Sequence, residues 1–261
     1  MLGFAAAAIV TTSFAQNHAV QQNASRARAT VARPAYTTYV RSWHAPVADR
    51  TAPVDDSGRT KLVLAALNTQ ERVELPVLAA RGGFAPHDLD RAAHLLREPS
   101  SGNEHPIEPR VLDAIYRIQT HFNAQEIRVV SGYRTPAAIA SSRGSQHGRG
   151  RAIDIVVPGA SDDDVAKFAR EMGFMGVGIY PVSGFVHVDV RDRSYFWVDS
   201  SGPGGRNRER GVLADVAARA DREALARGER GLPPALIGAD VDALLGGRAG
   251  PAAPVQEEDE D

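Results

Sequence analysis

Two segments in the second half of the chain alternate between apolar and polar side chains, as strands buried on one face do. They are AIDIVV at 152–157 and FVHVDV at 185–190. The apolar face carries only isoleucine and valine, namely Ile153, Ile155, Val157, Val186, Val188 and Val190. The other face carries Asp154 in the first segment and His187 and Asp189 in the second. We therefore expect two strands with a common core face and an open face that presents these polar side chains.

The same patterning predicts further elements. They are a hairpin of LVLAAL (62–67) and RVELPVL (72–78), a helix over 109–122, a buried strand IRVV (127–130) and a helix after Ser161. Pro76 cannot donate to a ladder and confines the second hairpin strand to a sheet edge. Ser161 is a typical N-cap, three aspartates follow it at the positive end of the helix dipole, and Gly173 ends the helix.

The chain divides by composition into four parts: an N-terminal segment (1–15), a linker, a folded domain and a C-terminal tail. Residues 16–58 have no sustained period and predict a flexible linker, and the folded domain is expected over 59–199. Residues 200–261 predict a tail of low order, with a surface helix in its Ala/Arg/Glu-rich part and an acidic end at 257–261. We therefore expect one folded domain between disordered extensions.

Residues 1–15 have features of a secretory signal peptide. An apolar run at 2–10 is followed by Ser13 and Ala15, small residues at the positions that signal peptidase reads. However, no lysine or arginine precedes the run, because the first basic residue is Arg26. We expect an exported protein, periplasmic or associated with the cell wall. The missing basic residue leaves two alternatives open: the start site lies elsewhere, or the segment is not a signal peptide. No run approaches the length of a membrane span, so none is expected.

Composition narrows the possible chemistry. The sequence contains no cysteine, which excludes disulfides, thiolate ligands and thiol nucleophiles. A formal net charge of -2 provides no general attraction for nucleic acid, so no nucleic-acid partner is expected. Any metal must therefore be bound by histidine and carboxylate side chains.

Asp154 and His187 would meet if the two alternating strands are neighbours. The glycine-rich loop at 148–150 could fold His147 towards them. Two imidazoles and one carboxylate with an open position suit a catalytic zinc ion, which polarises a carbonyl and lowers the pKa of water. A histidine on a strand can also be a surface or hydrogen-bonded residue without any metal, and the spacing alone leaves both interpretations open.

Four ordered motifs identify a resemblance that covers roughly residues 60–199. They are SGYR (131–134), Ser145-x-His147-x-x-Gly150-x-Ala152-x-Asp154, GVGIYP (176–181) and FVHVD (185–189). Together they resemble the zinc peptidoglycan peptidases related to D-Ala-D-Ala carboxypeptidases, and within them the branch that contains murein endopeptidase K.

The resemblance implies a fold and a set of roles. The fold is an α+β domain of the Hedgehog/D-Ala-D-Ala metallopeptidase type, with a small antiparallel sheet and helices packed on one face. Zinc would be bound by His147, Asp154 and His187. Arg134 would hold a substrate carboxylate or stabilise the oxyanion. From its strand position two residues after His187, and apart from the resemblance, Asp189 could be either the general base or the partner that orients an imidazole, and both roles remain open.

The sequence departs from the family pattern at three places. Several relatives carry a glutamate three residues before the last zinc histidine, where this chain has Gly184. Ile139 replaces an asparagine, and Val190-Arg191 replaces a small polar turn. His105 is a separate case: it lies in a loop before a proline, where a histidine more often has a structural role than a role in the site. These departures leave the metal ligands intact and put the substrate pocket in doubt.

The function expected from the resemblance is zinc-dependent hydrolysis of peptide bonds in peptidoglycan stem peptides or cross-links, as an endopeptidase. A D,D- or L,D-carboxypeptidase is the alternative enzyme. A non-catalytic wall-binding module on the same fold is a second alternative, and a scaffold protein without metal is a third. The expected partners are peptidoglycan peptides, and a monomer is expected.

Overall fold

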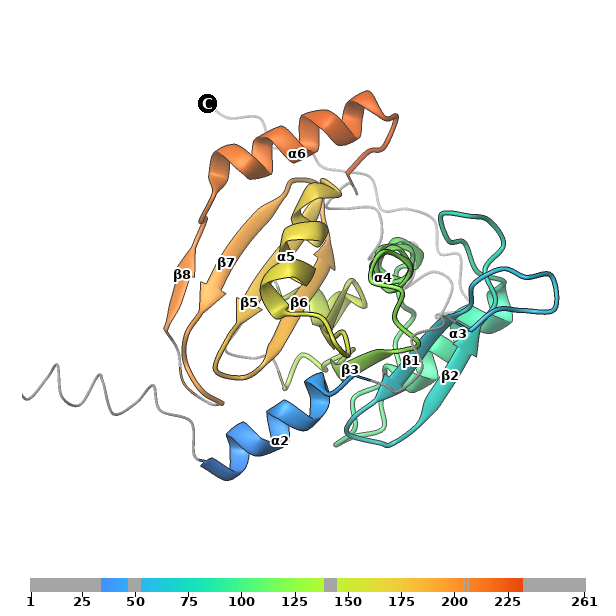
Figure 1. The fold of residues 1–261 in the computed structure, drawn as a ribbon, viewed down its shortest axis with the longest axis horizontal. Coiled ribbons are helices and arrows are strands. Elements are labelled where there is room, and N and C mark those ends of the chain that lie inside the picture. Colours follow the sequence, from blue (N-terminus) through green and yellow to red (C-terminus); the bar gives the residue numbers. More distant parts are fainter. Residues whose placement is uncertain (1–33, 47–52, 139–144, 204, 206, 232–261) are drawn as a thin grey trace, which may run out of the picture.

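The computed structural model describes residues 34–46, 53–138, 145–203, 205 and 207–231, which form an α+β fold (Figure 1). The strands are β1 (Leu62–Ala66), β2 (Arg72–Leu75), β3 (Ile127–Ser131), β4 (Ala152–Val156), β5 (Met175–Tyr180), β6 (Phe185–Val190), β7 (Tyr195–Asp199) and β8 (Arg208–Arg210). The helices are α2 (Pro34–His44), α3 (Pro86–Leu95), α4 (Pro109–His121), α5 (Asp162–Glu171), α6 (Ala214–Ala226) and the 3-10 helix η1 (Gln146–Arg149). The predicted α+β class is confirmed.

All the strands belong to one sheet in the order β2-β1-β3-β4-β6-β5-β7-β8. Most neighbours are antiparallel, but β1 runs parallel to β3 and β5 runs parallel to β7. The expected small antiparallel sheet was therefore wrong in both size and strand direction. Alternation along a strand shows which face is buried, and it contains no information about which strand lies beside it or in which direction that strand runs.

The locally encoded elements form where the sequence predicts them. β1 and β2 are an antiparallel hairpin, and β2 is an edge strand of the sheet. The Ser161 hydroxyl caps α5 by accepting a hydrogen bond from the Asp164 backbone N–H at 3.1 Å. Gly173 follows α5 in the left-handed region, with φ of 78°. These predictions are confirmed.

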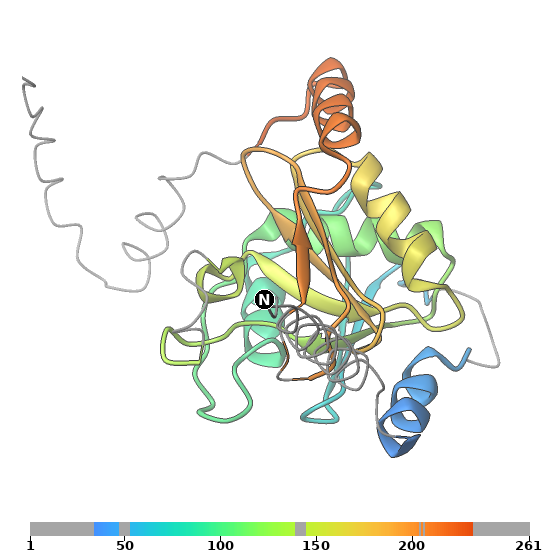
Figure 2. The ribbon, with the colours of Figure 1, turned by 90° about the vertical axis from the view of Figure 1, so that its left-hand side faces the viewer.

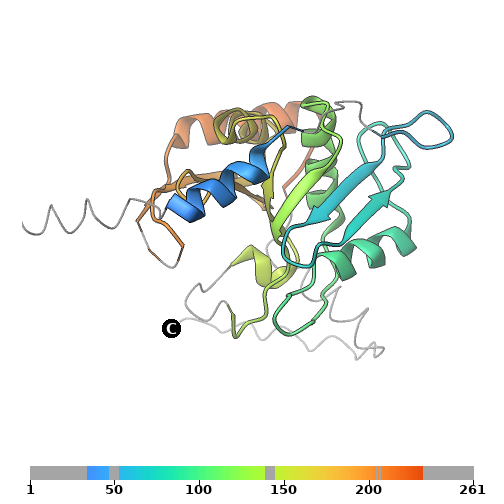
Figure 3. The same cartoon turned by 60° about the horizontal axis from the view of Figure 1, so that its bottom comes forward.

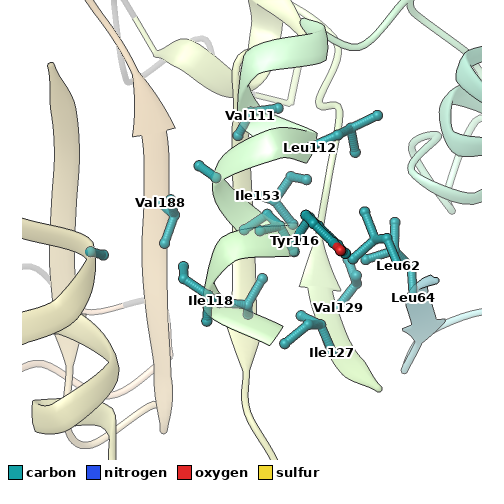
Figure 4. Close-up of a cluster of buried hydrophobic side chains, with 14 of the residues drawn as sticks. Leu62, Leu64, Val111, Leu112, Tyr116, Ile118, Ile127, Val129, Ile153 and Val188 are labelled. Atoms are coloured by element: carbon teal, nitrogen blue, oxygen red, sulfur yellow. The ribbon is translucent and has the colours of Figure 1, made fainter. Parts of the chain in front are cut away.

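The apolar core lies between the sheet and α4 and α5, which both pack on one face of it (Figure 1). Ile153 of β4 and Val188 of β6 are fully buried and lie beside α4 (Figure 4). Each such side chain contributes about 1.5–3 kcal/mol on burial. Gln119 is the polar exception on α4, and its amide bonds to the backbone of β1 at Val63 (2.8 Å) and just before it at Lys61 (2.6 Å). The face of β4 and β6 away from α4 is therefore available for other chemistry.

Helices also form outside the expected domain of 59–199. α2 lies inside the segment predicted to be a flexible linker, and its last carbonyl groups accept hydrogen bonds from the Arg128 guanidinium on β3. α6 lies where the composition predicts a surface helix, and it packs on α5 and β7. α2 and α6 lie at opposite ends of the sheet (Figures 1 and 2). Contacts with distant parts of the chain hold both helices in place. Such contacts cannot be predicted from composition.

Two expectations fall on residues outside the described part of the chain. They are the signal peptide at 1–15 and the acidic C-terminal end at 257–261. Within the described residues, no helix is both long enough and apolar enough to cross a lipid bilayer.

Candidate metal centre

The register of β4 and β6 places Asp154 directly opposite His187. Both side chains point away from the core face, so the predicted pairing of the two strands is confirmed. That face was expected to be open, and this expectation was wrong: the two residues are only 2% and 6% exposed. η1 contacts β4 on this side and covers them, on the side of the sheet away from α5 (Figure 3).

His147 reaches the strands because η1 ends in a tight reversal at Gly150. Gly150 has φ of 62°, and a Cβ atom there would lie 2.1 Å from the carbonyl oxygen of Pro106. Only glycine fits this position. The His147 Nδ1–H donates to the Gly132 carbonyl oxygen at 2.7 Å, which turns Nε2 towards β4 and β6. The predicted fold-back of this histidine is confirmed.

The three side chains converge on one point. His147 Nε2 lies 3.1 Å from His187 Nδ1 and 3.3 Å from Asp154 Oδ1, and the last two atoms are 2.9 Å apart. His187 donates its other ring N–H to Asp189, as His147 does to Gly132. Two nitrogen lone pairs and a carboxylate oxygen therefore face one another, and only a proton or a cation between them relieves the repulsion. These residues form a group that could hold a metal ion.

Arg134 fixes the carboxylate of Asp154. Its Nη2 donates to Asp154 Oδ2 at 2.6 Å and its Nε donates to Ser131 Oγ at 2.7 Å. The other carboxylate oxygen is thereby left to face the histidines. Burial opposes the negative charge of Asp154, but the charges of His147 and Arg134 and the histidine hydrogen bonds outweigh it. They hold the pKa of Asp154 well below its usual range.

The two histidines respond differently to the same burial. Burial dominates at His147 and lowers its pKa, because a charged imidazolium is poorly solvated there. At His187 the hydrogen bonds to Asp154 and Asp189, together with their charges, outweigh burial and raise the pKa. A proton and a bound metal ion would therefore compete for Nδ1 of His187.

His147, Asp154 and His187 form a triad. Asp189 lies on the far side of the His187 ring from the other two residues of this triad. Its Oδ2 accepts the His187 Nε2–H at 2.9 Å, and Arg191 donates to both of its oxygens. Burial raises the pKa of Asp189, but the bonds from His187 and Arg191 outweigh burial and lower the pKa to about 2. Gly176 on β5 leaves the space, because a Cβ atom there would lie 2.2 Å from Asp189 Oδ2.

Trp197 is a residue of this site that sequence reasoning missed. Its ring centroid lies 5.0 Å from that of His187, and its Nε1 donates to the Tyr180 hydroxyl at 3.1 Å. Gly178 makes room, because a Cβ atom there would lie 2.3 Å from the indole ring. The alternating glycines of GVG were the available signal. Tyr180 is half-buried on the face of the sheet that carries the triad.

His105 and Ser131, two further residues that the sequence analysis considered, have the following contacts. His105 stacks on buried Tyr133 at 4.9 Å between ring centroids, and its Nδ1 bonds to the Pro106 carbonyl oxygen. It is not in the metal-binding group, which agrees with its expected structural role. Ser131 accepts a hydrogen bond from Arg134 in the turn. Ile139 lies outside the described residues.

Gly184 occupies the position where several relatives carry a glutamate. It has φ of 70°, and a Cβ atom there would lie 2.0 Å from Val40 Cγ1 of α2. The Gly184 carbonyl oxygen also accepts a hydrogen bond from His44 Nε2 at 3.1 Å. The contact with α2 therefore leaves no room for a glutamate side chain in this arrangement.

Gly184→Ala is expected to destabilise the protein more than Gly58→Ala. Both positions have positive φ, 70° and 76°, but no atom lies within 4 Å of the Cβ position at Gly58. The left-handed backbone costs alanine about 1 kcal/mol in both variants, and displacing Val40 adds about 1–3 kcal/mol in Gly184→Ala alone. Urea denaturation measures both free energies of unfolding. Equal losses would show that α2 does not pack on Gly184.

Comparison with known proteins identifies the family. The family model described as peptidoglycan L,D-endopeptidase MepK matches residues 55–195. The chain belongs to this MepK family. The probable peptidoglycan L,D-endopeptidase MepK of Haemophilus influenzae is 34% identical over 134 residues, which cover 48% of this chain and 72% of that protein. The peptidoglycan L,D-endopeptidase MepK of Escherichia coli K12 is 31% identical over 138 residues, which cover 49% and 75%. No solved structure gives a significant match.

The MepK match contains the whole triad but not all of its surroundings. His147, Asp154 and His187 lie within residues 55–195, as do Arg134 and Asp189. The matched region begins after α2 and ends at the first residue of β7, before Trp197, β8 and α6. Helix α2, residue Trp197, strand β8 and helix α6 therefore lie outside the region that the MepK family model covers.

Proposed function

We propose that this protein is a zinc-dependent peptidoglycan endopeptidase that hydrolyses an L,D-peptide bond in wall cross-links. The observation that carries the proposal is the convergence of His147 Nε2, His187 Nδ1 and Asp154 Oδ1 within the region that matches the MepK family. Two relatives whose names specify peptidoglycan L,D-endopeptidase activity share 31% and 34% identity with the chain. The expected export to the periplasm or cell wall, with residues 1–15 as signal peptide, fits such a substrate.

Zinc fits the donor set better than magnesium or calcium. Imidazole nitrogen favours zinc and similar transition metals, whereas magnesium and calcium prefer oxygen ligands. Ligand distances of about 2.0–2.2 Å in a tetrahedron place neighbouring ligand atoms about 3.4 Å apart. The separations of 2.9, 3.1 and 3.3 Å are close to that value. With three protein ligands, the fourth position is free for chemistry.

The protein side chains divide the remaining work. Zinc, when bound, supplies a polarised scissile carbonyl and a water whose pKa falls to about 7. Arg134 keeps Asp154 ionised and turned towards the histidines, and its side chain is 38% exposed. That exposure allows its free donors to bind a substrate carboxylate or the developing oxyanion. Loss of Arg134 would therefore disturb both metal binding and substrate binding.

For Asp189 we propose a positioning role in place of the general base. A useful base has a pKa near the working pH, and the pKa of Asp189 is about 2. Both of its oxygens are already bonded, and it meets the ring nitrogen of His187 that faces away from Asp154. Such a carboxylate fixes the tautomer and orientation of a metal-binding imidazole.

The decisive experiment is turnover of isolated cell-wall sacculi by the full chain. We expect about one zinc ion per chain, release of shorter muropeptides, loss of this activity with a chelator, and recovery on adding zinc. Product masses that correspond to opened cross-links support the endopeptidase. Masses that show only loss of a terminal residue indicate the carboxypeptidase, and binding to sacculi without products indicates the wall-binding module. Absence of zinc from protein purified without chelator contradicts the proposal.

A further inference from the structure

β8 extends the sheet beside the candidate metal centre, beyond the region that matches the MepK family. Trp197 pairs with Arg210, and Asp199 pairs with Arg208. Because side chains alternate along a strand, Arg208 and Arg210 share the face of Trp197, while Glu209 points to the other face. The chain therefore places two arginines at the outer edge of the face that carries the triad.

A continuous row of side chains leads from the metal centre to this edge. Across the sheet, Asp154 is paired with His187, His187 with Gly178, Gly178 with Trp197, and Trp197 with Arg210. Three strand spacings of about 4.8 Å separate the backbones of His187 and Arg210, about 14 Å in all. An extended peptide advances about 3.4 Å per residue. A substrate held at the triad thus reaches β8 within roughly four residues.

The side chains between them are aromatic and basic, and Trp197 is only 6% exposed beneath two arginines. The guanidinium carbons of Arg191 and Arg208 each lie 5.8 Å from the centre of a Trp197 ring. Asp189 pairs with Arg191, and Asp199 pairs with Arg208 at 3.2 Å. Arg208 also donates to the Tyr180 hydroxyl at 2.8 Å. These two arginines are therefore held in place by carboxylates and rings, and their charges are largely compensated.

Arg210 differs from them because no described residue compensates its charge. It is exposed, and its side chain has no hydrogen-bond or ion-pair partner among the described residues. An arginine fork binds a carboxylate through paired N–H donors. The stem peptides of peptidoglycan carry carboxylates, so the substrate of the proposed function has the complementary charge.

We propose that Arg210, with Arg208 beside it, forms a subsite on β8 that binds a carboxylate of the substrate peptide away from the scissile bond. The inference rests on the proposed function for its ligand. It assigns Arg210 to substrate selection, with no part in the chemical step. The subsite distinguishes wall peptides with free carboxylates from wall peptides whose carboxylates are amidated.

Arg210→Gln tests the subsite, with Arg222→Gln as the matched control, since Arg222 is an exposed arginine on α6. The substrates are a cross-linked muropeptide and its form with amidated carboxylates. For Arg210→Gln we expect KM to rise about fivefold on the acidic substrate, an effect of the size that an exposed ion pair produces. We expect kcat to stay unchanged on both substrates, and we expect KM on the amidated substrate to stay unchanged as well. An equal rise in KM on both substrates, or the same rise in Arg222→Gln, overturns the inference.

A binding measurement separates this inference from the proposed function. An uncut synthetic wall tetrapeptide and its amidated form are titrated into the full chain and into Arg210→Gln by calorimetry. A preference of the wild-type protein for the acidic peptide, absent in the variant, supports the subsite whether or not the protein turns over. Equal affinity of the wild-type protein for both peptides overturns the subsite even when sacculi are cleaved. Intact sacculi after incubation with zinc-loaded protein count against the proposed function alone.

Discussion

Replacing Asp154 by asparagine is expected to reduce turnover of peptidoglycan about a thousandfold or more. The variant removes the only negative charge among the three proposed ligands and replaces one carboxylate oxygen by an NH2 group, which donates hydrogen bonds and cannot bind a cation. Metal chemistry contributes several kcal/mol to such reactions, and about 1.4 kcal/mol corresponds to a factor of ten in rate. Zinc content after dialysis measures the loss of metal binding, and release of muropeptides measures the loss of turnover.

The folded state of Asp154→Asn should survive, because Asp154 lies outside the apolar cluster between the sheet and α4. Zinc raises the melting temperature of a protein that binds it only when folded. We expect that rise in the wild-type protein and none in the variant, with similar melting temperatures for the two proteins in chelator.

Asp88→Asn is the matched control, since Asp88 on α3 is also 2% exposed and also pairs with an arginine. It should keep zinc and activity. If Asp154→Asn keeps the zinc-dependent rise, or Asp88→Asn loses activity equally, the metal site is contradicted.

The pairing of Asp154 with His187 could be predicted because strands encode faces with period two. Valines and isoleucines at every second position fix the core face, and the polar side chains between them must then lie on the other face. That reasoning needs only the assumption that the two strands are neighbours, which the register confirms. The position of Asp154 opposite His187 is therefore encoded in two short stretches of sequence.

The covering of the site could not be predicted in the same way. His147 is buried because Gly132 accepts its Nδ1–H and η1 packs on β4, and both contacts depend on how loops close in three dimensions. Trp197 reaches His187 because β7 pairs with β5, a parallel neighbour that periodicity does not reveal. α2 is held in place by Arg128, a residue far along the chain. Contacts between distant segments decide all three features.

Asp189 connects the triad to the arginine that lies over Trp197. It bonds His187 on one side and Arg191 on the other, and Arg191 also lies over Trp197. The same carboxylate therefore orients a proposed metal ligand and fixes a guanidinium beside the proposed subsite. A change at Asp189 should disturb metal binding first, because its bond to His187 is entirely buried.

Asp189→Asn is expected to weaken zinc affinity and to lower turnover, each by about 10–100-fold, the usual effect of losing a carboxylate that orients a metal-binding histidine. The asparagine carbonyl still accepts the His187 Nε2–H, but it no longer compensates Arg191 or favours that tautomer by charge. Competition with a chromophoric chelator measures the affinity, and muropeptide release at saturating zinc measures turnover. Glutamate at this position should not restore activity, because Gly176 leaves space for the shorter side chain only.

The pH profile of Asp189→Asn distinguishes positioning from general base catalysis. A positioning residue leaves the acid limb of kcat/KM in place, although activity is lower throughout and zinc binds more weakly. A general base takes the acid limb away with it and leaves zinc affinity unchanged. Asp221→Asn is the matched control, since Asp221 is also buried, accepts hydrogen bonds from the Phe174 and Ser194 backbone N–H groups, and is not part of the group that could hold a metal ion. Because the pKa of Asp189 is already about 2 and both its oxygens are occupied, we expect the acid limb to persist.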